Sequence, residues 1–234
     1  MIELVVFLGN PGREYERTRH NAPWILADRI PFCSSLNWQK KYRGLYASVE
    51  TGRLLPSEDP AGADGGADQN APDAQAAPGL AGASRKIHLL KPETYMNISG
   101  ESAVQAAAFF KVKAPSILVV HDELELPLGV VSFKFGGGLG GHRGLRSLKA
   151  SLGSADFWRL RIGIGRPDSR RPGEGGPPGS GEGIVDWVLS PFGPAETPLL
   201  DETLRALIPA FSAALLRGPE SLLPAWAKRK VIEE

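Results

Sequence analysis

The sequence predicts an α/β fold in which a mixed, mostly parallel central sheet is flanked by helices. Short apolar runs typical of buried strands alternate with longer segments of helical periodicity. No internal repeat interrupts this alternation. A chain of 234 residues with 42% hydrophobic residues can form one sizeable core. We therefore expect residues 1–234 to form a single domain, a sandwich of sheet and helices.

The first half of the chain contains three expected strands and one well-marked helix. Residues 4–8 form a continuous apolar run that ends at a Gly-Asn-Pro-Gly turn, as a buried central strand does. A helix should begin near Asn21, and its apolar periodicity stops at Pro31. Residues 45–50 and 86–90 have the pattern of two strands joined by a long loop.

The second half continues the alternation. Ser99 can cap a helix that carries Glu101 in its first turn, where a carboxylate is favoured by the helix dipole. Strands are expected at residues 117–120, 130–135 and 160–164, and further helices at residues 142–152, 195–216 and 221–228.

Two segments rich in Gly and Pro are expected to be low-complexity inserts. Residues 56–84 contain four Pro, five Gly, five acidic residues, and no aromatic or basic residue. Residues 168–183 contain three acidic residues and two Arg. Without both segments the formal net charge rises from +1 to about +7. The rest of the chain is therefore basic, which agrees with a nucleic-acid partner.

Several protein classes are excluded or disfavoured by the sequence. The single cysteine, Cys33, excludes an intramolecular disulfide or a cysteine-built metal cluster and suits a reducing compartment. No apolar run approaches the ~20 residues of a membrane helix. The early turn after residue 8 leaves no space for a signal peptide. We expect a cytoplasmic protein that does not contact membranes.

Polar side chains follow three of the expected strands. Asn10 follows the first strand, residues 91–97 follow the strand at 86–90, and Asp122 follows the strand at 117–120. Ligands of open α/β sheets bind outside the carboxyl ends of the strands. These residues are therefore candidates for a functional site.

The same strand ends lie in four motifs that together resemble one family. The motifs are L-G-N-P-G-x-x-Y-x-x-T-R-H-N at 8–21, K-P-x-T-Y-M-N-x-S-G at 91–100, the segment 121–145 with its glycine run, and R-L-R-x-G-x-G-R-P at 159–167. In this order they resemble the signatures of bacterial-type peptidyl-tRNA hydrolases. The glycine run alone also satisfies a dinucleotide-binding pattern, but the rest of that motif's context is missing.

The resemblance implies hydrolysis of the ester that joins a peptide to the 3′ ribose of tRNA, by a monomer without a metal or other cofactor. His20 is the expected base, because a neutral imidazole accepts a proton from water near neutral pH. Asp122 is its expected partner, although a carboxylate at a strand end can also simply cap nearby amides. Glu123 is the competing carboxylate. Asn10 is expected to hold the substrate's end or the attacking water through its amide.

The resemblance also implies a binding surface for the acceptor end of peptidyl-tRNA. Asn97 would hold the substrate, and Tyr15 and Met96 would line the cleft. Lys134 and Arg161 correspond to basic positions that contact phosphates. Such contacts weaken with salt and carry little sequence information, which suits an enzyme that accepts every tRNA.

Two positions depart from the family pattern. Arg143 stands where the family has Asn, and a permanently charged guanidinium cannot replace a neutral amide. We hypothesise that Arg143 contacts a tRNA phosphate or a terminal ribose. Pro23 stands where Gly is usual, which fits the first turn of a helix. The alternative to an esterase is a non-catalytic RNA-binding relative that acts as an adaptor.

Overall fold

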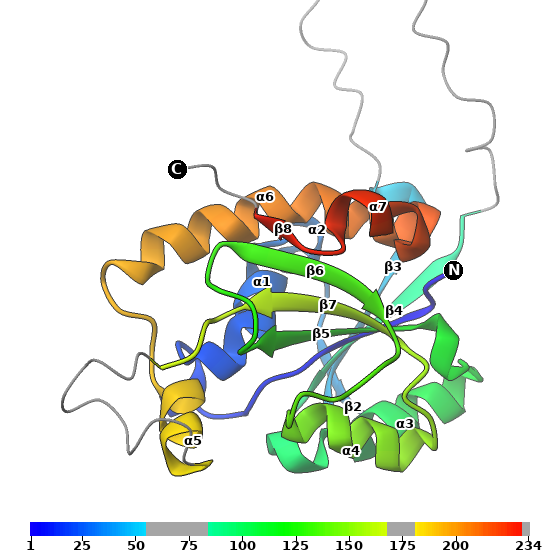
Figure 1. Ribbon diagram of the computed structural model, residues 1–234. Helices are drawn as coiled ribbons and strands as arrows, with labels where there is room; N and C mark the ends of the chain where they lie inside the picture. The colour runs from blue at the N-terminus through cyan, green and yellow to red at the C-terminus, as the bar shows by residue number, and fades with distance from the viewer. Residues whose placement is uncertain (55–83, 168–180, 231–234) are drawn as a thin grey trace, which may run out of the picture.

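The computed structural model describes residues 1–54, 84–167 and 181–230. Within these residues, one sheet has the strand order β2-β3-β4-β1-β5-β7-β6-β8 (Figure 1). The pairs β1·β4, β1·β5 and β5·β7 are parallel, and the pairs toward both edges are antiparallel. The predicted mixed sheet with a parallel centre is confirmed. Its strands are β1 Leu4–Phe7, β2 Gln39–Lys41, β3 Gly44–Glu50, β4 Lys86–Pro92, β5 Ile117–Glu123, β6 Val130–Phe135, β7 Trp158–Gly163 and β8 Arg229–Lys230.

Helices cover both faces of the sheet. On one face lie α3 and α4, and on the other lie α1 and the long α6, with α7 near the end of α6 (Figure 1). The α-helices are α1 Ala22–Arg29, α2 Pro31–Ser34, α3 Ser99–Phe110, α4 Arg143–Leu152, α5 Gly181–Leu189, α6 Glu196–Arg217 and α7 Leu223–Trp226. No helix in the described ranges is long and apolar enough to cross a membrane.

The two-sided burial explains why the central strands are apolar at every position. In β1, Val5 and Phe7 pack with α1 and α6, whereas Leu4 and Val6 pack in the cluster that includes α3 and α4. Alternate strand residues point to opposite faces, so both faces require apolar side chains. The register Phe7↔Val120 then places the carboxyl ends of β1 and β5 side by side.

The structure corrects several expected boundaries. Strand β5 continues to Glu123, so Asp122 lies within the strand rather than after it. The helix expected at 221–228 is the short α7, which is followed by β8 pairing with β6. Pro23 lies in the first turn of α1, as expected. The two predicted inserts lie outside the described residues, except Ser84 and residues 181–183, which begin α5.

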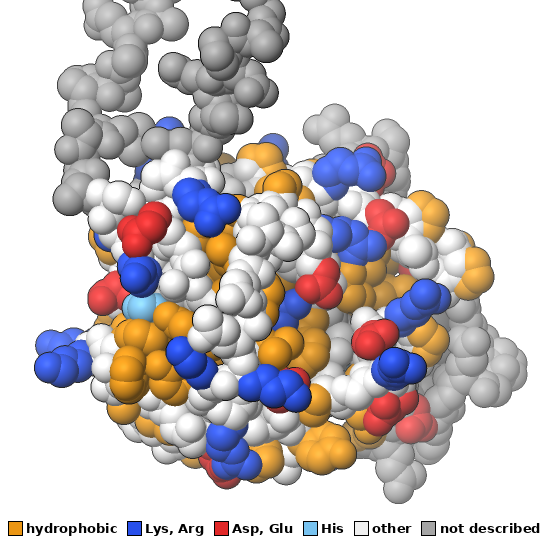
Figure 2. Space-filling view, turned by 180° about the vertical axis from the view of Figure 1, so that it is seen from behind, with side chains coloured by type: hydrophobic (Ala, Val, Ile, Leu, Met, Phe, Trp, Pro, Cys, Tyr) orange, Lys and Arg blue, Asp and Glu red, His pale blue; other side chains and the backbone are white. Residues whose placement is uncertain are grey.

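Lys and Arg side chains are spread over the face shown in Figure 2, where hydrophobic side chains lie between them. Large apolar side chains that are exposed include Tyr95 and Phe109. An interleaved surface of this kind suits a partner with both charged and apolar groups.

Candidate active site

A cleft of about 490 Å³ opens at the carboxyl ends of β1 and β5. Its walls come from the loop after β1, the 3₁₀ turns Arg19–Asn21 and Met96–Ile98, the start of α4, and α5. The cleft brings together seven of the nine candidate residues, which are Asn10, Tyr15, His20, Met96, Asn97, Asp122 and Arg143. Segments far apart in the sequence therefore meet where the strand ends predicted a site.

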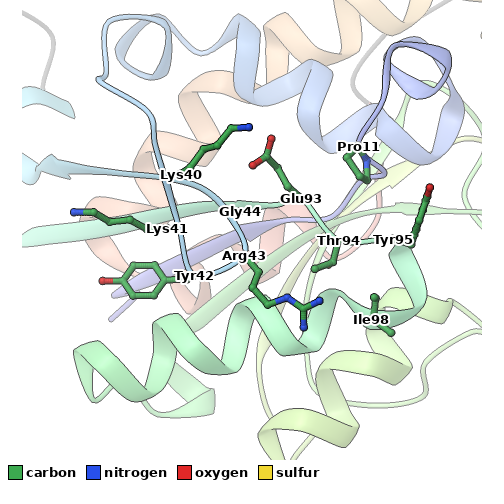
Figure 3. Close-up of a pocket in the computed structure, with 10 residues that line it drawn as sticks. All are labelled: Pro11, Lys40, Lys41, Tyr42, Arg43, Gly44, Glu93, Thr94, Tyr95 and Ile98. Atoms are coloured by element: carbon green, nitrogen blue, oxygen red, sulfur yellow. The ribbon is translucent and has the colours of Figure 1, made fainter.

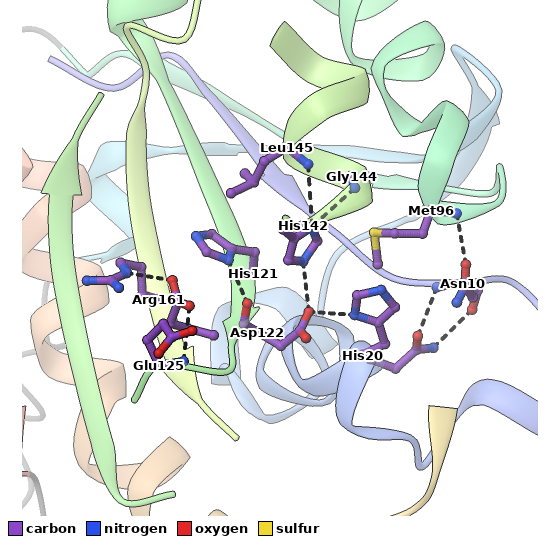
Figure 4. A network of polar contacts seen from close by, with 12 residues as sticks. Asn10, His20, Met96, His121, Asp122, Glu125, His142, Gly144, Leu145 and Arg161 are labelled. Carbon is purple, nitrogen blue, oxygen red and sulfur yellow. Dashed lines mark hydrogen bonds and ion pairs between the residues drawn. The ribbon is translucent and has the colours of Figure 1, made fainter. Parts of the chain in front are cut away.

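His20 and Asp122 form a buried pair at the bottom of this cleft. The distance between His20 Nδ1 and Asp122 Oδ1 is 2.8 Å (Figure 4). Both side chains are at least nine-tenths buried. An ionised carboxylate only accepts hydrogen bonds, so Nδ1 of His20 carries the proton. The other ring nitrogen, Nε2, is then left with a lone pair that can accept a proton from water.

His142 is the second partner of Asp122, and sequence reasoning did not single it out. Its Nε2 lies 3.0 Å from Asp122 Oδ1. Its Nδ1 accepts hydrogen bonds from the backbone N–H groups of Gly144 (3.1 Å) and Leu145 (3.4 Å), so His142 caps the N-terminus of α4. The signal in the sequence was its place at the start of the helix expected at 142–152, which in the structure begins at Arg143.

The surroundings of Asp122 keep its carboxyl ionised. Burial alone would raise the pKa of Asp122, but the electrostatic attraction of the His20 and His142 rings and their hydrogen bonds outweigh it and hold this pKa well below its usual range. Asp122 is thus a permanent acceptor that orients both imidazoles, whose ring centroids lie 5.0 Å apart.

Asn10 is fixed by hydrogen bonds on three sides. Its backbone N–H donates to Asn21 Oδ1 (2.8 Å), and its carbonyl accepts from Asn21 Nδ2 (2.9 Å). Its side-chain Oδ1 accepts from the backbone N–H of Met96 (2.8 Å). Among the described residues, nothing accepts a hydrogen bond from Asn10 Nδ2. The amide therefore presents a donor to the cleft.

The other candidate residues differ in their placement. Tyr15 is half-buried and Asn97 exposed along the cleft, while Met96 is buried in its wall. Arg143 lies at the rim on α4 and is exposed to solvent. Sequence reasoning missed two further arginines at this rim, Arg146 and Arg166.

Lys134 and Arg161 do not line this cleft. Lys134 is exposed on β6. Arg161 on β7 donates through Nε to Glu123 Oε2 at 2.9 Å. Glu123, the competing carboxylate, is therefore engaged by Arg161, and His20 is paired with Asp122 instead. The neighbouring Arg159 is buried and donates to the carbonyls of Gly137 and Gly138, which anchors the glycine run.

One wall of the cleft comes from α5, which was not predicted. Its residues Ile184, Val185, Val188 and Leu189 line the cavity. Their apolar run at the end of the second Gly/Pro-rich segment was the available signal. Arg19 connects this wall to the segment that carries His20, because its guanidinium donates to Ser190 Oγ (2.6 Å) and Glu196 Oε2 (2.6 Å) and lies 3.6 Å from the centre of the Trp187 ring.

His20, Asp122 and His142 are also a set whose ligand atoms lie within 4.8 Å of one another, close enough to hold a metal ion. Both imidazoles direct N–H groups at one carboxylate oxygen, and a bound cation would have to replace these two hydrogen bonds. The three side chains are therefore held together by hydrogen bonds to Asp122 in this structure.

Comparisons with known proteins point to one family. A family model described as Peptidyl-tRNA hydrolase matches residues 4–59 and 65–234. The peptidyl-tRNA hydrolase of Treponema pallidum (strain Nichols) is 44% identical over 234 residues, which is 99% of this chain and 97% of that protein. The crystal structure of peptidyl-tRNA hydrolase from Acinetobacter baumannii is 29% identical with a TM-score of 0.69, and covers 97% of this chain and 96% of its own. A peptidyl-tRNA hydrolase in complex with N-propanol has a TM-score of 0.70, with the same identity and coverage.

Proposed function

The chain belongs to the peptidyl-tRNA hydrolase family and hydrolyses peptidyl-tRNA, and we propose that His20 activates the attacking water while Asp122 orients His20. The bond cleaved is the ester between the peptide and the 3′ ribose of tRNA. The observation that carries this assignment is the 2.8 Å contact between His20 Nδ1 and Asp122 Oδ1. It leaves Nε2 of His20 as the unprotonated nitrogen of a buried imidazole in the cleft.

The proposed reaction moves one proton out to His20 and back. Nε2 of His20 removes a proton from water as the oxygen attacks the ester carbonyl. Asp122 stabilises the imidazolium that forms, through the same hydrogen bond that fixes the tautomer. When the tetrahedral intermediate collapses, the C–O bond to the ribose breaks and the 3′ oxygen takes the proton from His20. The products are the free peptide acid and tRNA.

Asn10 is suited to binding the carbonyl oxygen that gains negative charge. Its Oδ1 is occupied by the N–H of Met96, so the side chain cannot rotate to exchange donor and acceptor. The fixed donor Nδ2 is then directed to the substrate. A preorganised donor of this kind stabilises the transition state without reorganising during the reaction.

The tRNA side of the substrate is assigned to basic residues. We propose that Arg143, at the cleft rim, contacts a phosphate or ribose of the acceptor end. We propose that Lys134 on β6 and Arg161 on β7 contact phosphates farther along the acceptor stem; the support is that Lys134 is exposed and that Arg161 is oriented by Glu123. Tyr15, Met96 and Asn97 would contact the end of the substrate that enters the cleft.

We further propose that the protein acts in the cytoplasm as a monomer and without a metal or organic cofactor. The support is a site whose base, orienting carboxylate and donor amide all come from this one chain. An ester does not require metal activation when a base and a fixed donor are present.

A direct assay separates this function from that of a non-catalytic adaptor. Purified protein is incubated with N-acetyl-aminoacyl-tRNA, and free tRNA and free N-acetyl amino acid are quantified with and without EDTA. The proposal expects equimolar release of both products over many turnovers, unchanged by EDTA. Binding of the tRNA without turnover would support the adaptor, and loss of activity in EDTA would contradict cofactor-free hydrolysis.

A further inference from the structure

A second cavity, of about 680 Å³, lies beside the catalytic cleft. It is bounded by the hairpin that joins β2 to β3 and by the segment that follows β4 (Figure 3). Tyr95 lines both cavities, and Pro11, directly after Asn10, lines the second one. The two cavities are therefore neighbours along the carboxyl ends of the strands. Nothing in the proposed reaction uses the second cavity.

The hairpin wall of this cavity is held in an unusual backbone conformation. Tyr42 and Arg43 have φ values of 54° and 55°, in the left-handed region that usually requires Asn or Gly. The carbonyl of Tyr42 accepts a hydrogen bond from Ser102 Oγ (2.6 Å), and that of Arg43 accepts from the Glu93 backbone N–H (3.0 Å). Helix α3 and the end of β4 thus hold the wall in place.

The lining of the cavity is mixed in charge and polarity. Lys40 and Glu93 extend from opposite sides in its upper part (Figure 3), and no ion pair joins Lys40 to any described residue. Thr94 is buried, and its hydroxyl has no hydrogen-bond partner among the described residues. Tyr95 exposes 59% of its surface.

This mixture fits a peptide better than RNA. The carboxylate of Glu93 repels phosphates. The rest of the lining has three cations, Lys40, Lys41 and Arg43, of which Arg43 is paired with Glu101, together with apolar surface that accommodates varied side chains. Strand β2 is the edge of the sheet, and its residues Lys40 and Lys41 line the cavity, so backbone groups are available at this wall. Pairing with an edge strand recognises peptide backbone irrespective of sequence.

We propose that this second cavity binds the peptide of peptidyl-tRNA, at the residues that precede the esterified one. The inference rests on the proposed function, since it places the ester at His20 and Asn10. Lys134 and Arg161, the proposed phosphate contacts, belong to strands on the other side of β5 in the sheet. The peptide therefore leaves the ester toward β4 and β2, where Lys40 and Glu93 lie. An extended chain advances about 3.3 Å per residue, so the residues that precede the esterified one extend toward these side chains.

The test varies the charge of the peptide and the charge of the cavity, and measures how KM responds to each combination. Three substrates are prepared on the same tRNA: N-acetyl-Gly, N-acetyl-Asp-Asp-Gly and N-acetyl-Lys-Lys-Gly. Lys40→Ala leaves Glu93 and should raise the KM of the acidic peptide about five-fold relative to the basic one. Glu93→Ala leaves Lys40 and should produce the opposite preference. Neither variant should change the KM of N-acetyl-Gly-tRNA, which is too short to reach these residues.

Lys113→Ala is the matched control, because Lys113 is exposed and precedes the amino end of β5, away from both cavities. It should behave as wild type with all three substrates. The proposal is overturned if the two cavity variants show no opposite charge preference. It is also overturned if Lys40→Ala raises the KM of all three substrates equally, because that result identifies an RNA contact. Failure of wild type to cleave even N-acetyl-Gly-tRNA would instead contradict the proposed function.

Discussion

His142 Nε2 lies 3.0 Å from Asp122 Oδ1, the same oxygen that His20 Nδ1 approaches at 2.8 Å. One carboxylate oxygen thus accepts hydrogen bonds from two imidazoles (Figure 4). Because both rings must direct an N–H at this oxygen, their tautomers are set together. His142 acts as a positioning residue for Asp122, and its other nitrogen connects the pair to the start of α4.

The positioning role of His142 is separable from its capping role. His142→Ala removes both the contact to Asp122 and the cap of α4, so we expect kcat to fall roughly ten-fold and the free energy of unfolding to fall by about 1 kcal/mol. His142→Asn can still cap the helix but is too short to reach Asp122. It should recover the stability while kcat stays low. Recovery of kcat together with stability would assign His142 a purely structural role.

Arg19 should control the wall formed by α5. In Arg19→Lys the stacking on Trp187 and the paired contacts to Ser190 and Glu196 are lost, because an ammonium is not a planar fork. We expect the KM for peptidyl-tRNA to rise several-fold and the free energy of unfolding to fall by about 1–3 kcal/mol. Urea unfolding and steady-state kinetics measure the two effects.

Arg29→Lys is the control for Arg19→Lys. Arg29 pairs with Asp201 at an exposed position between α1 and α6. Its replacement should change stability by less than about 1 kcal/mol and leave KM unchanged. Equal effects of the two substitutions would mean that Arg19 has no special role at the cleft.

The sequence predicted the parallel centre of the sheet, but not its edge strands β2 and β8 or the long-range contacts around the cleft. Continuous apolar runs predicted β1 and β5, and the polar residues at the carboxyl ends of these runs made Asn10 and Asp122 candidate site residues, which the structure brings into one cleft. Arg19 contacts Glu196, a residue 177 positions away, and no local pattern signals such a contact. The edge strand β2 was missed because its three exposed residues have no apolar periodicity. Helix α5 was missed because it begins within a Gly/Pro-rich segment.

The salt dependence of binding should report on Arg143. If Arg143 contacts a phosphate, Arg143→Asn should lower the slope of log affinity against log salt concentration by about 0.7 to 0.9. The slope is measured by filter binding of peptidyl-tRNA to proteins that also carry His20→Ala, so that the substrate is not cleaved, at salt concentrations from about 50 to about 300 mM. Lys149→Asn removes an exposed charge on the same helix outside the cleft and should leave it unchanged. An unchanged slope in Arg143→Asn would show that Arg143 does not contact a phosphate.

His121 should make the folded state less stable in mild acid. Burial, and to a lesser extent the neighbouring His142, hold the pKa of His121 well below its usual value, and its Nε2 has no hydrogen-bond partner among the described residues. The unfolded chain therefore binds a proton first as the pH falls, and this stability is lost below about pH 6.5 at up to ~1.4 kcal/mol per pH unit. His121→Gln should flatten the change in unfolding free energy between pH 7 and 5. Parallel curves for both proteins would contradict the prediction.

The role of His20 as the base is the central claim, and single-turnover hydrolysis by His20→Ala tests it most directly. The reaction uses saturating enzyme and labelled N-acetyl-aminoacyl-tRNA, with binding measured separately. We expect the rate constant of ester cleavage to fall by at least about 10²-fold. The dissociation constant for the substrate should stay within about two-fold of the wild-type value, because His20 is not expected to contribute to binding. A His20→Ala protein that cleaves the ester within about ten-fold of the wild-type rate would contradict the assignment of His20 as the base.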